Sequence, residues 1–100
     1  MAKGKLIVTA RPESPDTVDD FNRWYDESHI PEVLALPGFA SARRYEALDG
    51  ESYVTIYDAD DVEKAKTGMA EAQQSGAMTR PVGVQLDPPP TVEWLQELST

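Results

Sequence analysis

Four segments of the chain carry the apolar pattern of β-strands. Residues 5–10 are rich in β-branched residues and are followed by the turn signal Arg-Pro-Glu. Residues 39–48 and 53–58 alternate in character, and the Asp-Gly between them is a strong hairpin signal. A fourth strand is expected over residues 80–86. In the second segment, alternation predicts one face with Phe39, Ser41, Arg43 and Tyr45 and the other with Ala40, Ala42, Arg44 and Glu46.

Two helical segments separate these strands. The first is expected to begin at Ser14, whose hydroxyl suits an N-cap and is followed by a proline. Pro31 interrupts this helix because proline removes one backbone donor, and a Pro-Gly pair ends it. The second helix is expected to begin at Asp60, with a glutamate three residues later, and to end at Gly76. The expected buried stripes are Val18, Phe21, Tyr25, Val33 and Leu36 in the first helix and Val62, Ala65, Met69 and Ala72 in the second.

The order of these elements is β-α-β-β-α-β. It predicts an α+β, ferredoxin-like domain with a four-stranded antiparallel sheet over residues 1–87. Three prolines then open a segment, residues 88–100, that is expected to be a stiff spacer and a short amphipathic helical tail. The apolar members of that tail are Val92, Trp94, Leu95 and Leu98. With helices on one side of the sheet, the other face is expected to carry Leu6, Val8, Val54 and Ile56.

The composition narrows the classes of partner. One hundred residues make one domain with a thin core, which favours a homodimer. Nine basic residues against 18 acidic ones leave a net charge of −9, which argues against nucleic acids and anionic membranes. The absence of cysteine excludes disulfides, thiolate metal sites and cysteine nucleophiles. No segment has the pattern of a signal peptide or a membrane span, so a cytoplasmic location is expected.

Residues 24–33, WYDESHIPEV, contain the one histidine of the chain. Phe21, Tyr25 and His29 are spaced by four residues and therefore share one slowly drifting helical face. Histidine is the side chain best suited to move a proton at neutral pH. On the residues alone, packing at a helix end is the commoner role of such a histidine, and a catalytic role stays an alternative.

The stretch FNRWYDESHIPEVLALPGFASARRYE, residues 21–46, resembles the dimeric α+β barrel superfamily, particularly its EthD-like and antibiotic-biosynthesis-monooxygenase-like branches. The resemblance implies two sheets that face each other across a two-fold axis, with the helices outside. It also implies a pocket in each subunit between its sheet and its helices. Members of this superfamily include cofactor-independent oxygenases, cyclases, isomerases, decarboxylases and haem enzymes. The resemblance therefore implies a fold and leaves the reaction open.

With this resemblance, the leading hypothesis is a cofactor-independent acid–base enzyme of isomerase, cyclase, lyase or decarboxylase type. Its substrate would be a small, apolar, oxygenated aromatic or polyketide-like molecule. His29 is expected to transfer the proton and Tyr25 to stabilise the oxyanion, with no metal and no cofactor. The expected substrate-binding residues are Trp24, Arg43, Tyr45 and Tyr57. A cofactor-independent monooxygenase of the same fold and a non-catalytic small-molecule carrier or accessory protein are the alternatives.

Overall fold

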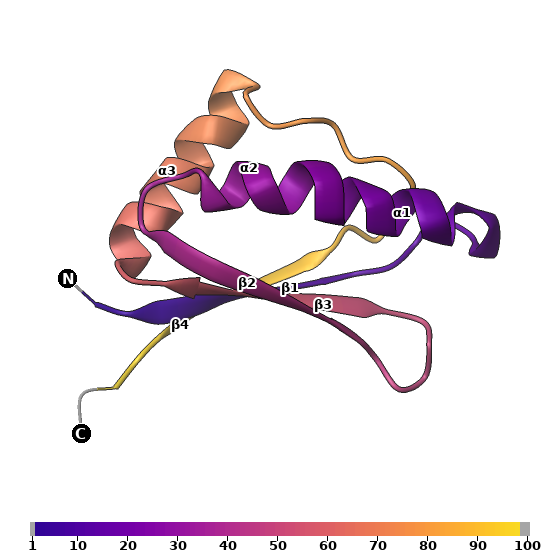
Figure 1. Cartoon of the computed structure of the whole chain (residues 1–100), viewed down its shortest axis with the longest axis horizontal. Helices are drawn as coiled ribbons and strands as arrows, with labels where there is room; N and C mark the ends of the chain where they lie inside the picture. The colour runs from indigo at the N-terminus through magenta and orange to yellow at the C-terminus, as the bar shows by residue number, and fades with distance from the viewer. Residues whose placement is uncertain (1, 99–100) are drawn as a thin grey trace.

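The sheet of this protein has four antiparallel strands, and the helices lie on one of its faces (Figure 1). The computed structural model describes residues 2–98. The strands are β1 (Gly4–Ala10), β2 (Phe39–Glu46), β3 (Tyr53–Ala59) and β4 (Thr91–Gln96), in the spatial order β2-β3-β1-β4. The helical segments are the 3₁₀ turn η1 (Pro15–Thr17), α1 (Val18–Trp24), the π-helix η2 (Tyr25–His29), α2 (Ile30–Leu34) and α3 (Val62–Ser75). The predicted fold class, α+β and ferredoxin-like, is confirmed.

The strand β1 lies in the middle of the sheet and supplies the side chains on which the helices pack. Leu6 lies opposite Tyr57 of β3 and opposite Trp94 of β4. Leu6 and Tyr57 are buried in one apolar cluster together with Val33 of α2 and Met69 of α3. Full burial of each apolar side chain of this size contributes about 1.5–3 kcal/mol. This cluster therefore fixes both helical segments to the same face of the sheet.

The helix α3 begins and ends close to its predicted positions. Its N-cap is Asp61 rather than Asp60, because the Asp61 carboxylate accepts a hydrogen bond from the Lys64 N–H at 3.1 Å. Gly76 ends the helix in the left-handed conformation, with φ of 74°. The buried residues of α3 are those of the predicted stripe, Val62, Ala65, Met69 and Ala72. Within residues 2–98, no helix has the length and apolar character needed to cross a membrane.

The fourth strand is Thr91–Gln96, so the prediction of a strand over residues 80–86 was wrong. Residues 80–86 make only an isolated bridge, between Val84 and Pro12. Pro81 offers no N–H to a ladder, and Gly83 has a left-handed φ of 71°, so this segment cannot pair along its length. The prediction of a helical tail after the three prolines was also wrong. Residues Thr91–Gln96 form a strand that pairs with β1 and completes the sheet.

The faces of the sheet also differ from the prediction. A β-bulge between Phe39 and Ser41 shifts the register of β2 by one residue. Phe39 therefore packs on the helix side with Ala42, whereas Arg43 lies on the opposite face. Leu6 and Val8 were expected on the face that the helices leave uncovered, but they belong to the cluster under the helices. The uncovered face carries instead Ile7 beside the expected Val54 and Ile56.

Candidate active site

Within WYDESHIPEV, the residues Tyr25–His29 form a π-helix, and this irregular turn positions the histidine. The Ile30 N–H donates to the Tyr25 carbonyl, five residues back. Pro31 has no N–H to give the carbonyl of Glu27, so the α-helical ladder is already interrupted here. The helix continues through Pro31 as α2, so the proline marks a widened turn and not the end of the helix.

The widened turn brings Trp24 and His29 together. In an α-helix, two side chains five residues apart point about 140° away from each other, at 3.6 residues per turn. Here the Trp24 and His29 rings stack, with centroids 4.5 Å apart and planes 19° apart. The Tyr25 ring meets the His29 ring edge-on at 5.4 Å. The imidazole is therefore held between two aromatic rings from its own turn.

These rings line a cavity of about 450 Å³ between the helices and the sheet. That size lies within the range of about 300–1,000 Å³ found for small-molecule sites. Its wall is formed by the end of α1, by η2, α3, β1 and β4, and by the segment 81–90. The lining residues are Leu6, Val8, Trp24, Tyr25, His29, Lys66, Met69, Ala70, Gln73, Pro81, Val84, Leu86, Pro90, Val92 and Trp94. Of the predicted site residues, the structure brings Trp24, Tyr25 and His29 to this cavity.

The His29 imidazole is held in its neutral form by its surroundings. Burial lowers its pKa, and the nearby Glu32 carboxylate opposes that shift. The Nδ1 atom is enclosed and has no hydrogen-bond partner among residues 2–98, so an added proton there would be unpaired. Glu32 itself accepts hydrogen bonds from the Thr79 hydroxyl and from the Thr79 N–H, the latter at 3.0 Å. These bonds lower the pKa of Glu32, so its carboxylate stays ionised.

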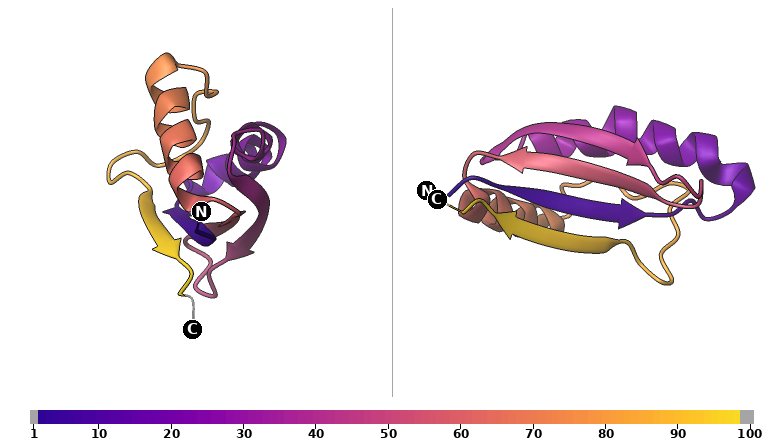
Figure 2. Two further views of the ribbon diagram at one scale, coloured as in Figure 1. Left: turned by 90° about the vertical axis from the view of Figure 1, so that its left-hand side faces the viewer. Right: turned by 90° about the horizontal axis from the view of Figure 1, so that it is seen from below.

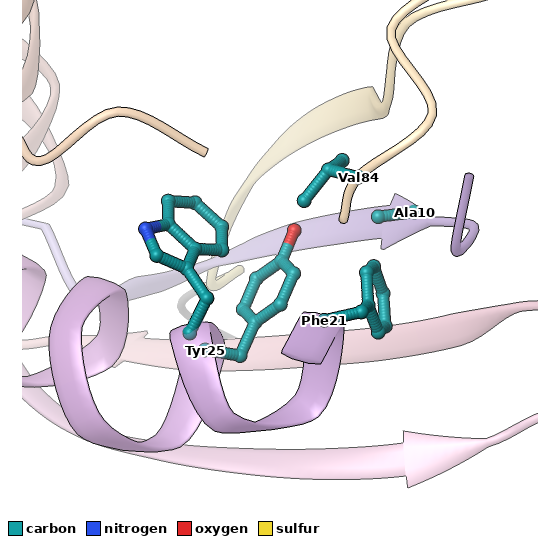
Figure 3. Packing of buried hydrophobic residues seen from close by; sticks show 5 residues of the cluster. Ala10, Phe21, Tyr25 and Val84 are labelled. Atoms are coloured by element: carbon teal, nitrogen blue, oxygen red, sulfur yellow. The ribbon is translucent and has the colours of Figure 1, made fainter. Parts of the chain in front are cut away.

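Tyr25 supplies a protonated hydroxyl to the same site. Its ring packs edge-on against Phe21 at 5.1 Å, and its hydroxyl points toward Val84 and Ala10 (Figure 3). Burial raises the pKa of Tyr25, and the Arg44 guanidinium opposes that shift. A phenol in this state donates a hydrogen bond at neutral pH, which suits it to stabilise a negative oxygen.

Arg44 holds the continuous helix formed by α1, η2 and α2, here called the site helix, onto the sheet. Its guanidinium lies 4.7 Å from the centroid of the Tyr25 ring, within reach of a cation–π interaction. It also donates to the Asn22 side-chain oxygen at 2.9 Å and forms an ion pair with Asp26 at 3.4 Å. The bulge in β2 directs Arg44 toward the helix, and Arg44 in turn supports the ring of Tyr25 from the side of the sheet.

The other three predicted substrate-binding residues lie elsewhere. Arg43 and Tyr45 are exposed on the uncovered face of the sheet, because β2 alternates from the bulge onward. Tyr57 lies on the helix side but is fully enclosed in the core, and burial raises the pKa of its hydroxyl. The structure therefore does not bring these three residues to the cavity.

Two walls of the cavity were not foreseen. The first is a face of α3 that carries Lys66, Ala70 and Gln73 beside the buried stripe. Their spacing of four and three residues is the one signal in the sequence that they share a face. The second is β4, where Trp94 alternates with its neighbours along the strand and so turns its ring to the cavity.

A second hollow of about 350 Å³ lies at the end of the sheet beside Lys5 and contains no aromatic residue and no histidine. In residues 2–98, no three histidine or acidic side chains gather into a metal site.

Comparisons with known proteins place this fold. A family model described as "Domain of unknown function (DUF4286)" matches residues 12–79, more than half of the chain. No curated protein matches the sequence. The structure of Rv0793 from Mycobacterium tuberculosis is similar with 21% identity and a TM-score of 0.63, over 99% of this chain and 98% of that one. A monooxygenase from the gene ActVA-Orf6 of Streptomyces coelicolor, in complex with the ligand Nanaomycin D, is similar with 15% identity and a TM-score of 0.67, over 99% and 90%.

At these identities the two structures bear on the fold alone. Both share with this chain the α+β, ferredoxin-like fold that the order of its helices and strands predicted. The family match spans η2, the hairpin of β2 and β3, and α3, and so includes the two walls of the cavity that the π-helix and α3 form. The chain belongs to the DUF4286 family.

Proposed function

We propose that this chain is a cofactor-independent enzyme that moves a proton on a small, flat, mainly apolar and oxygenated molecule. The molecule would bind in the 450 Å³ cavity, with His29 as the proton-transfer group. One observation carries the proposal: a neutral imidazole, stacked on Trp24, lies in the wall of an apolar cavity. General acid–base catalysis needs such a group within reach of the substrate.

The state of His29 restricts the substrate. Because burial lowers the pKa of His29, the imidazole is a weak base, and the substrate must carry an acidic hydrogen. A C–H bond between a carbonyl group and an aromatic ring meets this need. His29 takes the proton, and the electron pair of the C–H bond moves toward the carbonyl oxygen. The Tyr25 hydroxyl donates a hydrogen bond to that oxygen. Return of the proton at another carbon completes an isomerisation, and attack of the carbanion on a second carbonyl group leads to a cyclisation.

A monooxygenase reaction is the second candidate. The similarity to a monooxygenase in complex with Nanaomycin D favours it. This reaction begins with the same proton transfer to His29, after which the substrate carbanion reacts with O₂. In total, one CH₂ group and one O₂ become one carbonyl group and one water molecule. The substrate supplies all four electrons, so this chemistry needs no separate reductant.

Anthrone, a flat ketone with an acidic methylene group, tests both reactions. Exchange of its methylene hydrogens in D₂O under nitrogen reports the proton transfer, and O₂ uptake in air reports oxygenation. We expect His29→Asn to retain its circular dichroism spectrum and to lose about 100-fold or more in rate. The matched control is Glu27→Gln, which changes an exposed side chain in the same π-helix and should keep the wild-type rate.

The two outcomes that oppose the proposal are distinct. A folded His29→Asn variant with the wild-type rate removes His29 from the reaction. A wild-type protein that binds anthrone, but catalyses neither exchange nor O₂ uptake, contradicts the proposed proton transfer and favours a carrier.

We further propose that the chain forms a homodimer through the uncovered face of its sheet. That face carries Ile7, Val54 and Ile56, together with the half-exposed Tyr45 and Leu95, and no helix of residues 2–98 covers it (Figure 2). A second copy of the chain would bury these side chains. Light scattering at micromolar concentration should give twice the 11.0 kDa of one chain, and a stable monomer would contradict the proposal.

A further inference from the structure

The charge in the wall of the cavity is opposite to the charge of the protein. The chain carries 18 acidic and 9 basic residues. Among the residues of the described range 2–98 that line the cavity, however, there is no aspartate or glutamate, and Lys66 is the one lysine or arginine. Beyond about 8–10 Å, the charge of the rest of the protein is largely screened at physiological salt. A group bound at this wall therefore senses Lys66 more than the net charge of −9.

The helix α3 separates its charged side chains between two sides. Lys66, Ala70 and Gln73 line the cavity. The acidic residues Glu63 and Glu71 line a different hollow, together with Lys64. Lys66 forms no ion pair within 4.0 Å in the described part of the chain, so its ammonium group is available to a ligand. The sequence of α3 thus gives the cavity a cation and directs its carboxylates elsewhere.

The spacing on α3 leaves room for a small polar group between two donors. Lys66 and Gln73 are seven residues apart, about 10 Å along the helix axis at 1.5 Å per residue. Both have long side chains that end in N–H donors. Ala70 lies between them and contributes only a methyl group. A planar group of two oxygen atoms could therefore lie over Ala70 and accept hydrogen bonds from one or both neighbours.

We propose that the ligand of this cavity is an aromatic or polyketide-derived carboxylic acid, whose carboxylate is bound by Lys66 while its ring system lies against Trp24 and His29. Lys66 is then a specificity-determining residue, and the anchored carboxylate orients the acidic C–H toward the imidazole. The proposal rests on the cavity of the proposed function, but it concerns binding and does not require turnover.

A pair of probes isolates the charge. The compounds 2-naphthoate and methyl 2-naphthoate share the same rings and differ in whether the carboxyl group is ionised. Isothermal titration calorimetry on the full chain should show that the wild-type protein binds the acid more tightly than the ester. Lys66→Gln should weaken naphthoate about three- to fivefold, the upper part of the range for an exposed ion pair, and leave the ester unchanged. Added salt should reduce the preference for the acid.

The matched control is Lys64→Gln. It removes the same charge from the same helix but on the side away from the cavity. If both variants weaken naphthoate equally, only the net charge matters, and the role of Lys66 is refuted. If the wild-type protein binds the ester as well as the acid, the carboxylate preference is refuted, while the apolar cavity of the proposed function stands. If neither probe binds at millimolar concentration, both this proposal and the cavity as an aromatic site are overturned.

Discussion

The glycine between α2 and β2 offers a sharp test of how the site helix is fixed. Gly38 has φ of 91°, a left-handed conformation that side chains other than glycine rarely adopt. Its carbonyl accepts hydrogen bonds from the Asp60 N–H at 2.9 Å and the Asp61 N–H at 3.4 Å, at the start of α3. Gly38 therefore joins the end of the site helix to the start of the helix that forms the opposite wall. We predict that Gly38→Ala strongly destabilises the protein.

The magnitude follows from two separate costs. An L-residue in the left-handed conformation costs about 1–2 kcal/mol. In addition, a Cβ at Gly38 would lie 2.6 Å from the Ala65 nitrogen and 2.7 Å from the Asp61 carbonyl oxygen. Both are backbone atoms of α3 or its cap, and overpacking of this kind costs about 1–3 kcal/mol. The sum is about 2–5 kcal/mol, a large share of the stability of about 5–15 kcal/mol that is typical of a domain.

Gly76→Ala is the matched control. Gly76 has a similar φ of 74°, but a Cβ there would meet no atom within 4 Å. It should therefore show only the conformational cost of about 1–2 kcal/mol. Urea unfolding followed by circular dichroism measures both variants. A Gly38→Ala variant that loses no more stability than Gly76→Ala would show that α3 yields to the new methyl group, and would refute the reasoning.

Three further predictions concern the site and the sheet. Burial lowers the pKa of His29, so the neutral imidazole contributes its full stability above the unfolded pKa of about 6.5, and this contribution is lost as pH falls through the lower folded pKa. Urea unfolding of His29→Asn should therefore depend less on acid pH than unfolding of the wild-type protein. Pro31→Ala restores an N–H that favours the α-helical ladder, so the His29 ring should leave Trp24, and its pKa by NMR should rise toward the ordinary value; an unchanged pKa would mean that packing alone sets the π-helix. Deleting residues 91–100 removes β4 from β1 and should lower the melting temperature, whereas an unchanged melting temperature would make the strand dispensable.

The sequence determined the elements whose signals are local. The Asp-Gly pair predicted the hairpin of β2 and β3. The turn itself is longer than the predicted two residues: Gly50 has a left-handed φ of 73°, Asp49 does not have a positive φ, and the Gly50 N–H donates to the Ala47 carbonyl. Gly76 and the apolar stripe predicted α3, because helix ends and amphipathic faces depend on residues within a few positions of each other. Trp24, Tyr25 and His29 were predicted as site residues mainly from the resemblance of residues 21–46 to a known superfamily, and all three line one cavity.

Only the tertiary structure decided which pattern the remaining segments follow. The apolar residues of Thr91–Gln96 fit a helix or a strand, and the free edge of β1 selected the strand because it offers backbone partners. One extra residue in β2 moved Phe39 to the face of Ala42 and Arg44. This face packs under the helices, so Arg44 lies beside Tyr25, and Arg43 and Tyr45 stay outside. Lys66 entered the site for the same reason as Trp94: contacts between segments far apart in the chain define a cavity, and no local pattern reports them.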